Sequence, residues 1–184
     1  MTKPEDDRKA AKRFDVSVDT RKFEIELFWK RSLFFWGFIA VAFIGYGALT
    51  QAKAPDLAHV MACFGLVCSV AWTLANRGSK YWQEAWEQKV EREERDVLGG
   101  PFFSVVEPVQ TWKGSWLRAR RYSVSKLTIA LSDFTALVWF IVTVKSLINA
   151  PNTFTIIVAL LTSGVVVSMF MFARTNDRTP QASG

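Results

Sequence analysis

Residues 32–76 read SLFFWGFIAVAFIGYGALTQAKAPDLAHVMACFGLVCSVAWTLAN and give the clearest indication of the architecture. Two uncharged runs, 32–52 and 57–76, contain 21 and 20 residues and are separated by a short turn that includes Lys53 and Pro55. About 20 apolar residues in a helix cross the ~30 Å hydrocarbon layer of a bilayer. This stretch is therefore predicted to be a hairpin of two membrane-spanning helices.

A second pair of such runs follows nearer the C-terminus. Residues 127–144 carry a single charge, at Asp133, and residues 146–173 carry none. Half of the chain is hydrophobic, yet 22% of it is charged, and those charges gather outside the four runs. This pattern excludes a soluble globular domain. It predicts an all-α, polytopic membrane protein with four transmembrane helices.

The basic residues predict the orientation of the chain. Of 23 Lys and Arg residues, 9 lie in 1–31, 10 in 77–126 and 2 in the tail after Ala173. The two turns on the other side contain only Lys53 and Lys145. Because positively charged loops remain on the cytoplasmic side of a membrane, both termini are predicted to be cytoplasmic.

These patterns divide the chain into five parts. Residues 1–20 are predicted to be a mobile cytosolic arm, because polar residues dominate there and few apolar ones could anchor it. The alternation of Phe14, Val16 and Val18 leaves open a short strand that forms on contact with a partner. The other parts are an interfacial lead-in with the first transmembrane hairpin (21–76), a cytosolic helical region with a basic amphipathic segment (77–126), the second transmembrane hairpin (127–173) and a cytosolic tail (174–184).

The second span is predicted to continue into the cytosol as a long helix. Residues that favour helix run from Leu57 to Leu98, and the first stop signal is the Gly-Gly-Pro sequence at 99–101. One face of the projecting part is apolar and consists of Trp82, Trp86, Val90 and Val97. A lone helix has nothing against which to bury this stripe, so a partner helix is required, from this chain or from a neighbouring copy. We predict a helical collar that holds an oligomer together.

Five cations precede the third span, interleaved with aromatic residues and without any acid: Lys113, Arg118, Arg120, Arg121 and Lys126. Such a segment next to a span is typical of contact with anionic lipid headgroups, where each cation contributes about 1 kcal/mol. The same residues could bind nucleic acid only if they reached away from the bilayer. We therefore favour anionic lipids as the partner.

A polar stripe on the third span consists of Ser125, Thr128, Ser132 and Thr135, with Asp133 beside it. A charged residue inside a bilayer costs about 2.5–3.5 kcal/mol on insertion scales, so Asp133 must face protein or water. One interpretation is a candidate pore, in which the stripe lines a lumen and Asp133 forms a ring around an oligomer axis. The other, which we favour, is a carboxylate hydrogen-bonded to Ser132, Thr135 or Lys126.

The sequence offers little for catalysis, metals or cofactors. The single histidine, His59, lies at the outer edge of the second span, and the only cysteines, Cys63 and Cys68, lie within that span. A metal site would need three or four converging ligands, so packing is the favoured role for these residues. The Gly-Gly-Pro sequence lacks the spacing and the lysine of a phosphate-binding loop. We predict a protein without a cofactor that is not an enzyme.

Two stretches carry a resemblance to a known family. They are EIELFWKRS at 24–32 with FWGFIA at 35–40, and NRGSKYWQExWE at 76–87. They resemble the RipA-like family of small bacterial inner-membrane proteins, described as octameric. The resemblance implies inner-membrane residence and a homo-oligomer, with no catalytic residues to carry over. Members of this type can lie beside phage-defence genes, which suggests a membrane effector by analogy only.

Three functions remain open. The predicted one is a non-enzymatic oligomer that permeabilises or gates the membrane, as an antiphage-defence effector. The first alternative is a membrane scaffold whose collar recruits cytosolic partners or modulates lipid metabolism. The second, a small-solute transporter, is disfavoured because no inverted repeat with broken helices is detectable. A pore requires a polar stripe along a lumen, whereas a scaffold requires an apolar or lipid-filled centre.

Overall fold

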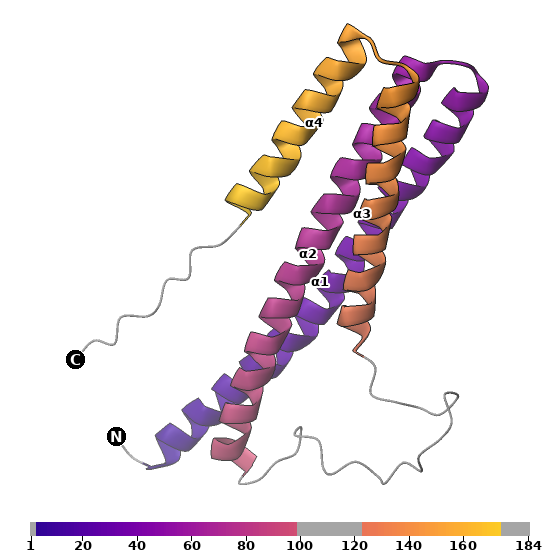
Figure 1. Ribbon diagram of the computed structural model, residues 1–184. Coiled ribbons are helices and arrows are strands. Elements are labelled where there is room, and N and C mark those ends of the chain that lie inside the picture. Colours follow the sequence, from indigo (N-terminus) through magenta and orange to yellow (C-terminus); the bar gives the residue numbers. More distant parts are fainter. Residues whose placement is uncertain (1–2, 99–122, 174–184) are drawn as a thin grey trace, which may run out of the picture. The chain divides into compact units, whose positions relative to one another are not determined.

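The computed structural model describes residues 3–98 and 123–173, and within these ranges it contains helices and no strands. The four helices are α1 (Lys3–Gln51), α2 (Pro55–Leu98), α3 (Val124–Asn149) and α4 (Thr153–Phe172) (Figure 1). Each contains a segment long enough and apolar enough to cross a membrane. The all-α fold with four transmembrane helices is thus confirmed, and so is the continuation of the second span to Leu98.

The chain forms two compact units. The hairpin unit comprises Met1–Ser32 and Asn76–Thr128, and the span unit comprises Leu33–Ala75 and Ile129–Gly184. The hairpin unit therefore holds the first part of α1, the last part of α2 and the start of α3. The span unit holds the rest of these three helices and the whole of α4.

In the hairpin unit, the structure differs from the predicted mobile arm. Residues 3–20 form the beginning of α1, and neither the arm nor the alternative short strand is seen there. Two local contacts support this helix: an ion pair of 2.8 Å between Lys9 Nζ and Glu5 Oε1, and a hydrogen bond of 2.8 Å from Ser17 Oγ to the Arg13 carbonyl. Packing supports it as well, since one face of α1 carries the buried Ser17 and the half-buried Phe14.

That face of α1 packs on α2 as an antiparallel helical hairpin. Its less exposed side chains recur every three or four residues, namely Phe14, Ser17, Arg21, Glu24, Phe28 and Ser32. The less exposed side chains of α2 follow the same spacing, and they are Ser79, Gln83, Trp86, Val90, Glu94 and Val97. Such a period is that of a coiled-coil seam. Hydrogen bonds join the two helices from Arg31 to Ser79 Oγ at 2.9 Å and from Arg21 to Glu87 at 3.5 Å.

The core of the span unit is built around two tryptophans. Trp139 of α3 is fully buried against Ala42 and Ala62, with Tyr46, Met61, Leu66 and Val142 at its edges. Trp72 of α2 is 2% exposed and packs with Ile39 and Cys68. Small residues on α1 and α2 leave room for the large rings, so three helices can approach closely.

Helix α4 contributes much less to this core. In the most apolar 18-residue stretch of α4, only 6% is buried, whereas 56% is buried in the corresponding stretch of α2. Its start is well defined, because the Asn152 side chain accepts a hydrogen bond from the Thr155 backbone amide and donates one of 2.7 Å to Asp56 at the start of α2. Beyond this point an apolar groove of about 530 Å³ lies among α2, α3 and α4.

Candidate functional site

The predicted polar stripe of α3 meets polar side chains of α2 in the hairpin unit. Ser125 Oγ donates a hydrogen bond of 2.9 Å to Gln83 Oε1. The amide of Asn76 donates one of 3.5 Å to the carbonyl of Thr128, whose own hydroxyl bonds to the Val124 carbonyl. The first two members of the stripe therefore lie at a helix–helix contact within one chain.

In the span unit, Asp133 also contacts α2. Its Oδ1 accepts a hydrogen bond of 3.3 Å from Thr73 Oγ1. Ser132 is fully buried and donates to the Ile129 carbonyl, and Thr135 donates to the Leu131 carbonyl. The carboxylate is thus hydrogen-bonded by protein, and its partners include a threonine of the neighbouring helix. Sequence reasoning did not identify Thr73, because nothing in the pattern sets the register of α3 against α2.

The outer faces of the span unit are apolar. Every exposed side chain in residues 129–144 of α3 is apolar, and the same holds for 33–49 of α1 and 57–75 of α2. On α4, the exposed polar side chains in residues 154–172 are Ser163 and Ser168, and both donate to carbonyls of their own helix. The described spans therefore present almost no polar surface outward.

The apolar stripe predicted on α2 is divided between two environments. Val90 is 3% exposed and is buried within its own chain, so it is not available to a neighbouring copy. Trp86 and Val97 are half-buried, and Lys89 lies over the Trp86 ring at 4.7 Å. Trp82 remains 47% exposed beside Tyr81. The required partner helix is thus α1 of the same chain, and Trp82 is the member of the stripe whose aromatic face remains exposed.

The predicted lipid-contact segment lies mainly outside the described residues, since Lys113, Arg118, Arg120 and Arg121 fall in 99–122. Lys126 is described and is exposed near Glu84 of α2. A hydrogen bond from Lys80, together with the positive charges of Lys80 and Lys126, lowers the pKa of Glu84 below its ordinary value of 4.5. The Lys80–Glu84 pair has an N–O distance of 2.9 Å. Glu84 therefore stays ionised at neutral pH.

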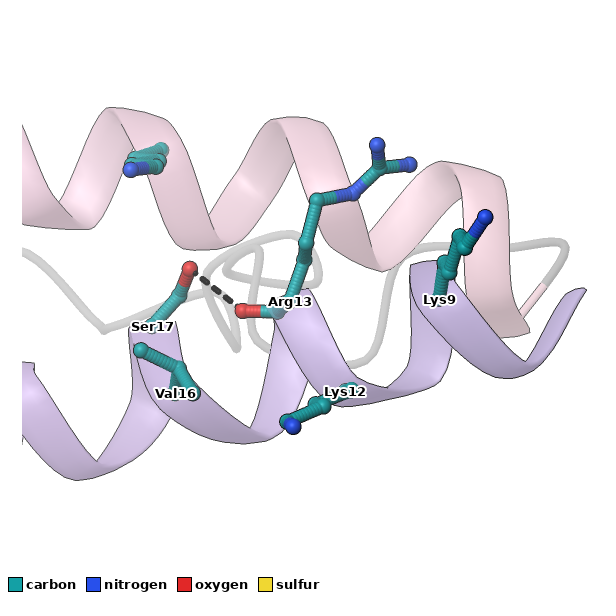
Figure 2. A pocket seen from close by; sticks show the side chains of 6 residues that line it. Lys9, Lys12, Arg13, Val16 and Ser17 are labelled. Atoms are coloured by element: carbon teal, nitrogen blue, oxygen red, sulfur yellow. Dashed lines mark hydrogen bonds between the residues drawn. The ribbon is translucent and has the colours of Figure 1, made fainter. Parts of the chain in front are cut away.

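A basic pocket was not predicted. It has a volume of about 470 Å³ and lies on the hairpin unit between α1 and α2 (Figure 2). Its lining consists of Lys9, Lys12, Arg13, Val16 and Ser17 of α1, and Lys89 of α2. The sequence signal was the spacing of the five α1 positions, which places them on one helical face. Because residues 1–20 were predicted to be a mobile arm, no helical face was expected there.

The histidine and cysteines lie in the core of the span unit. His59 is fully buried, and its Nε2 is 3.5 Å from the Cys63 sulfur. Cys68 is buried beside Trp72. Among the residues that the structure describes, no three His, Cys, Asp or Glu side chains are grouped closely enough to hold a metal ion.

Comparison with known proteins gives one match. Residues 11–148 match the family described as the octameric membrane protein family (8xMP), in agreement with the octameric family that the sequence motifs resemble. No curated protein and no solved structure matches the chain. The matched region includes α1 from its third turn, all of α2 and nearly all of α3. With this match over most of its length, and with four helices able to cross a bilayer, the chain is a multi-pass membrane protein that belongs to the octameric membrane protein family.

Proposed function

We propose that the protein is a non-enzymatic scaffold of the bacterial inner membrane, assembled from eight copies, whose cytosolic hairpins form a collar that recruits soluble partners. The number of copies follows the description of the family. The orientation, with both termini in the cytoplasm, follows the excess of Lys and Arg in 1–31 and 77–126. The hairpin unit then lies on the cytoplasmic side.

One observation favours a scaffold over a pore. The polar side chains of α3 are used inside the subunit, while its exposed face in residues 129–144 is apolar. A water-filled pathway requires polar or charged groups that face a lumen. A ring of subunits with these outer faces would enclose apolar side chains or lipid. The predicted arrangement of Ser132 and Asp133 around a lumen is therefore not the one that the geometry favours.

The contact between subunits is proposed to include two exposed aromatic side chains of α2 in the hairpin unit. Trp82 and Tyr81 are 47% and 56% exposed, and both lie on α2 outside the membrane span. Large exposed aromatic side chains are typical of protein interfaces. The weakly buried helix α4 offers a second surface, within the membrane, for lipid or a neighbouring copy.

The test of the assembly is the mass of the detergent-solubilised protein, measured by size exclusion with light scattering. The wild type is expected to have the mass of eight chains, and Trp82→Ala a smaller one. Trp29→Ala is the matched control, since Trp29 is 44% exposed but lies where the chain enters the membrane. A wild-type monomer would overturn the oligomeric scaffold. An unchanged mass of Trp82→Ala would exclude Trp82 as a contact.

A second candidate function is a gated ion pathway, including the antiphage effector role. Asp133 favours it, because a half-buried carboxylate in a span could become part of a pathway after the helices rearrange. Ion flux from liposomes containing wild type, Asp133→Asn or Asp133→Leu distinguishes the two. The scaffold predicts no flux for any of the three proteins. If the wild type conducts ions and both substitutions reduce the flux, the scaffold proposal is wrong and the ion pathway is the function.

A further inference from the structure

We propose that the basic pocket of the hairpin unit binds a soluble anion that carries several phosphate groups. The pocket consists of Lys9, Lys12, Arg13, Val16, Ser17 and Lys89. The proposal rests on the cytosolic placement of the hairpin unit that is part of the proposed function. It does not depend on the scaffold role or on the number of subunits.

The arrangement of the lining residues makes the pocket a site for anions. Residues 9, 12, 13, 16 and 17 lie on one face of α1, where Figure 2 labels them, and Lys89 of α2 completes the described lining. Four of the six side chains are cationic, and none of the described lining residues is acidic. The volume of about 470 Å³ lies within the range of about 300–1,000 Å³ that is usual for small-molecule sites.

Several cations around one hollow repel one another, and a bound anion relieves this repulsion. Lysine ammonium groups bind phosphate as point charges, so three lysines and one arginine suit a ligand with more than one phosphate. Ser17 already donates its hydroxyl proton to the Arg13 carbonyl at 2.8 Å, a bond that Figure 2 shows. The cations are therefore the groups that would hold the ligand.

The existing contacts of the three lysines leave them available. Lys9 pairs with Glu5, but both side chains are about half exposed, and surface pairs of this kind are weak. Lys89 lies over the Trp86 ring with its Nζ 4.7 Å from the ring centre, a contact that keeps its charge. Lys12 is exposed.

The position of the pocket along α1 favours a soluble ligand over a lipid headgroup. Trp29, Lys30 and Arg31 are the expected interfacial residues at the entrance to the first span. Arg13 precedes Arg31 by 18 residues on the same helix, which is about 27 Å along its axis. The headgroup region beyond the hydrocarbon is only about 5–8 Å thick on each side. This length of helix is several times the thickness of the headgroup layer, which favours a soluble ligand for the pocket.

The test is isothermal titration calorimetry of the full-length protein in neutral detergent with inorganic tripolyphosphate. The wild type is expected to bind, and added salt should weaken the binding. The variant Lys12→Gln with Lys89→Gln should bind about tenfold more weakly, because it loses two of the four cations. The matched control is Lys22→Gln with Lys30→Gln, which removes the same charge outside the pocket and should keep the wild-type affinity. Circular dichroism establishes that all the proteins are equally helical.

Two results would overturn the pocket as an anion site: no binding by the wild type, or an equal loss of affinity in the pocket variant and the control. Nanodiscs distinguish the source of the phosphate groups. If adding phosphatidylglycerol to phosphatidylcholine nanodiscs weakens tripolyphosphate binding, headgroups occupy the pocket and the soluble-ligand assignment is wrong. If the protein proves monomeric but still binds tripolyphosphate, the scaffold proposal fails and the anion pocket stands. The two proposals can therefore fail independently.

Discussion

At the scale of single residues, the packing of the span unit depends on the absence of a side chain at Gly65. The fully buried indole ring of Trp139 lies so close to Gly65 that a Cβ atom placed there would overlap it. Gly65 and Ser69 form one of the small-residue pairs that the sequence contains, and such pairs allow close helix packing in membranes. Here the space is taken by an aromatic ring of another helix.

We expect Gly65→Ala to destabilise the protein by about 1–3 kcal/mol, because Trp139 must leave its position or the helices must separate. The control is Gly47→Ala on α1, where no atom lies within 4 Å of the added Cβ. Thermal unfolding in detergent, followed by circular dichroism, measures the difference. Equal stability of the two variants would contradict the assigned role of Gly65.

The hydrogen bond between Thr73 and Asp133 is the second residue-scale feature with a measurable effect. Thr73→Val keeps the shape of the side chain and removes the donor to Asp133 Oδ1, 3.3 Å away. Hydrogen bonds between membrane helices contribute about 0.6 kcal/mol on average and at most about 1.7, and we expect a loss in this range. Thr135→Val is the control, since Thr135 bonds only to the Leu131 carbonyl of its own helix. A larger loss for the control would exclude Asp133 as a significant partner of Thr73.

At the scale of elements, the pairing of α1 with α2 explains why each of these helices extends beyond its span. Neither extension has a wholly apolar face: the α1 seam includes Ser17 and Arg21, and the α2 seam includes Gln83 and Glu94. The apolar members are few, and Val90, at 3% exposure, is the most buried of those on α2. Stability of the hairpin should therefore depend strongly on single apolar contacts.

Val90→Ala removes two buried methyl groups and is expected to cost about 1–3 kcal/mol of hairpin stability. Val16→Ala removes the same atoms from a side chain that is 55% exposed, so its effect should be within about 0.5 kcal/mol. Hydrogen exchange of the backbone amides in 3–31 and 77–98 measures the local opening of the hairpin. Identical exchange in both variants would show that Val90 does not stabilise the hairpin.

At the scale of the whole molecule, the sequence predicts best the helices whose length and composition are set by the need to cross the bilayer. Four apolar runs of 18–28 residues, with Asp133 as the single charge among them, indicated the spans, and helix-forming residues up to Leu98 indicated the extension of α2. The helical start of α1 was not predictable by hydrophobic periodicity, because the face that packs there includes the buried Ser17 and the half-buried Arg21 and Glu24, none of which is apolar. The basic pocket depends on that helix and on its register against Lys89, which composition does not determine.

The orientation of the whole molecule in the membrane is a separate prediction, since it follows from charge and not from packing. With 21 of the 23 Lys and Arg residues in 1–31, 77–126 and the tail, moving them across the membrane would be strongly disfavoured. A phosphatase reporter, active only outside the cytoplasm, should be active when fused at Ala54 or Asn149 and inactive at Gly100 or Gly184. A fluorescent-protein reporter, which folds only inside, should give the opposite pattern and so controls for expression. An external position for Gly100 would remove the cytosolic hairpin, and with it both the proposed collar and the access of a cytosolic anion to the basic pocket.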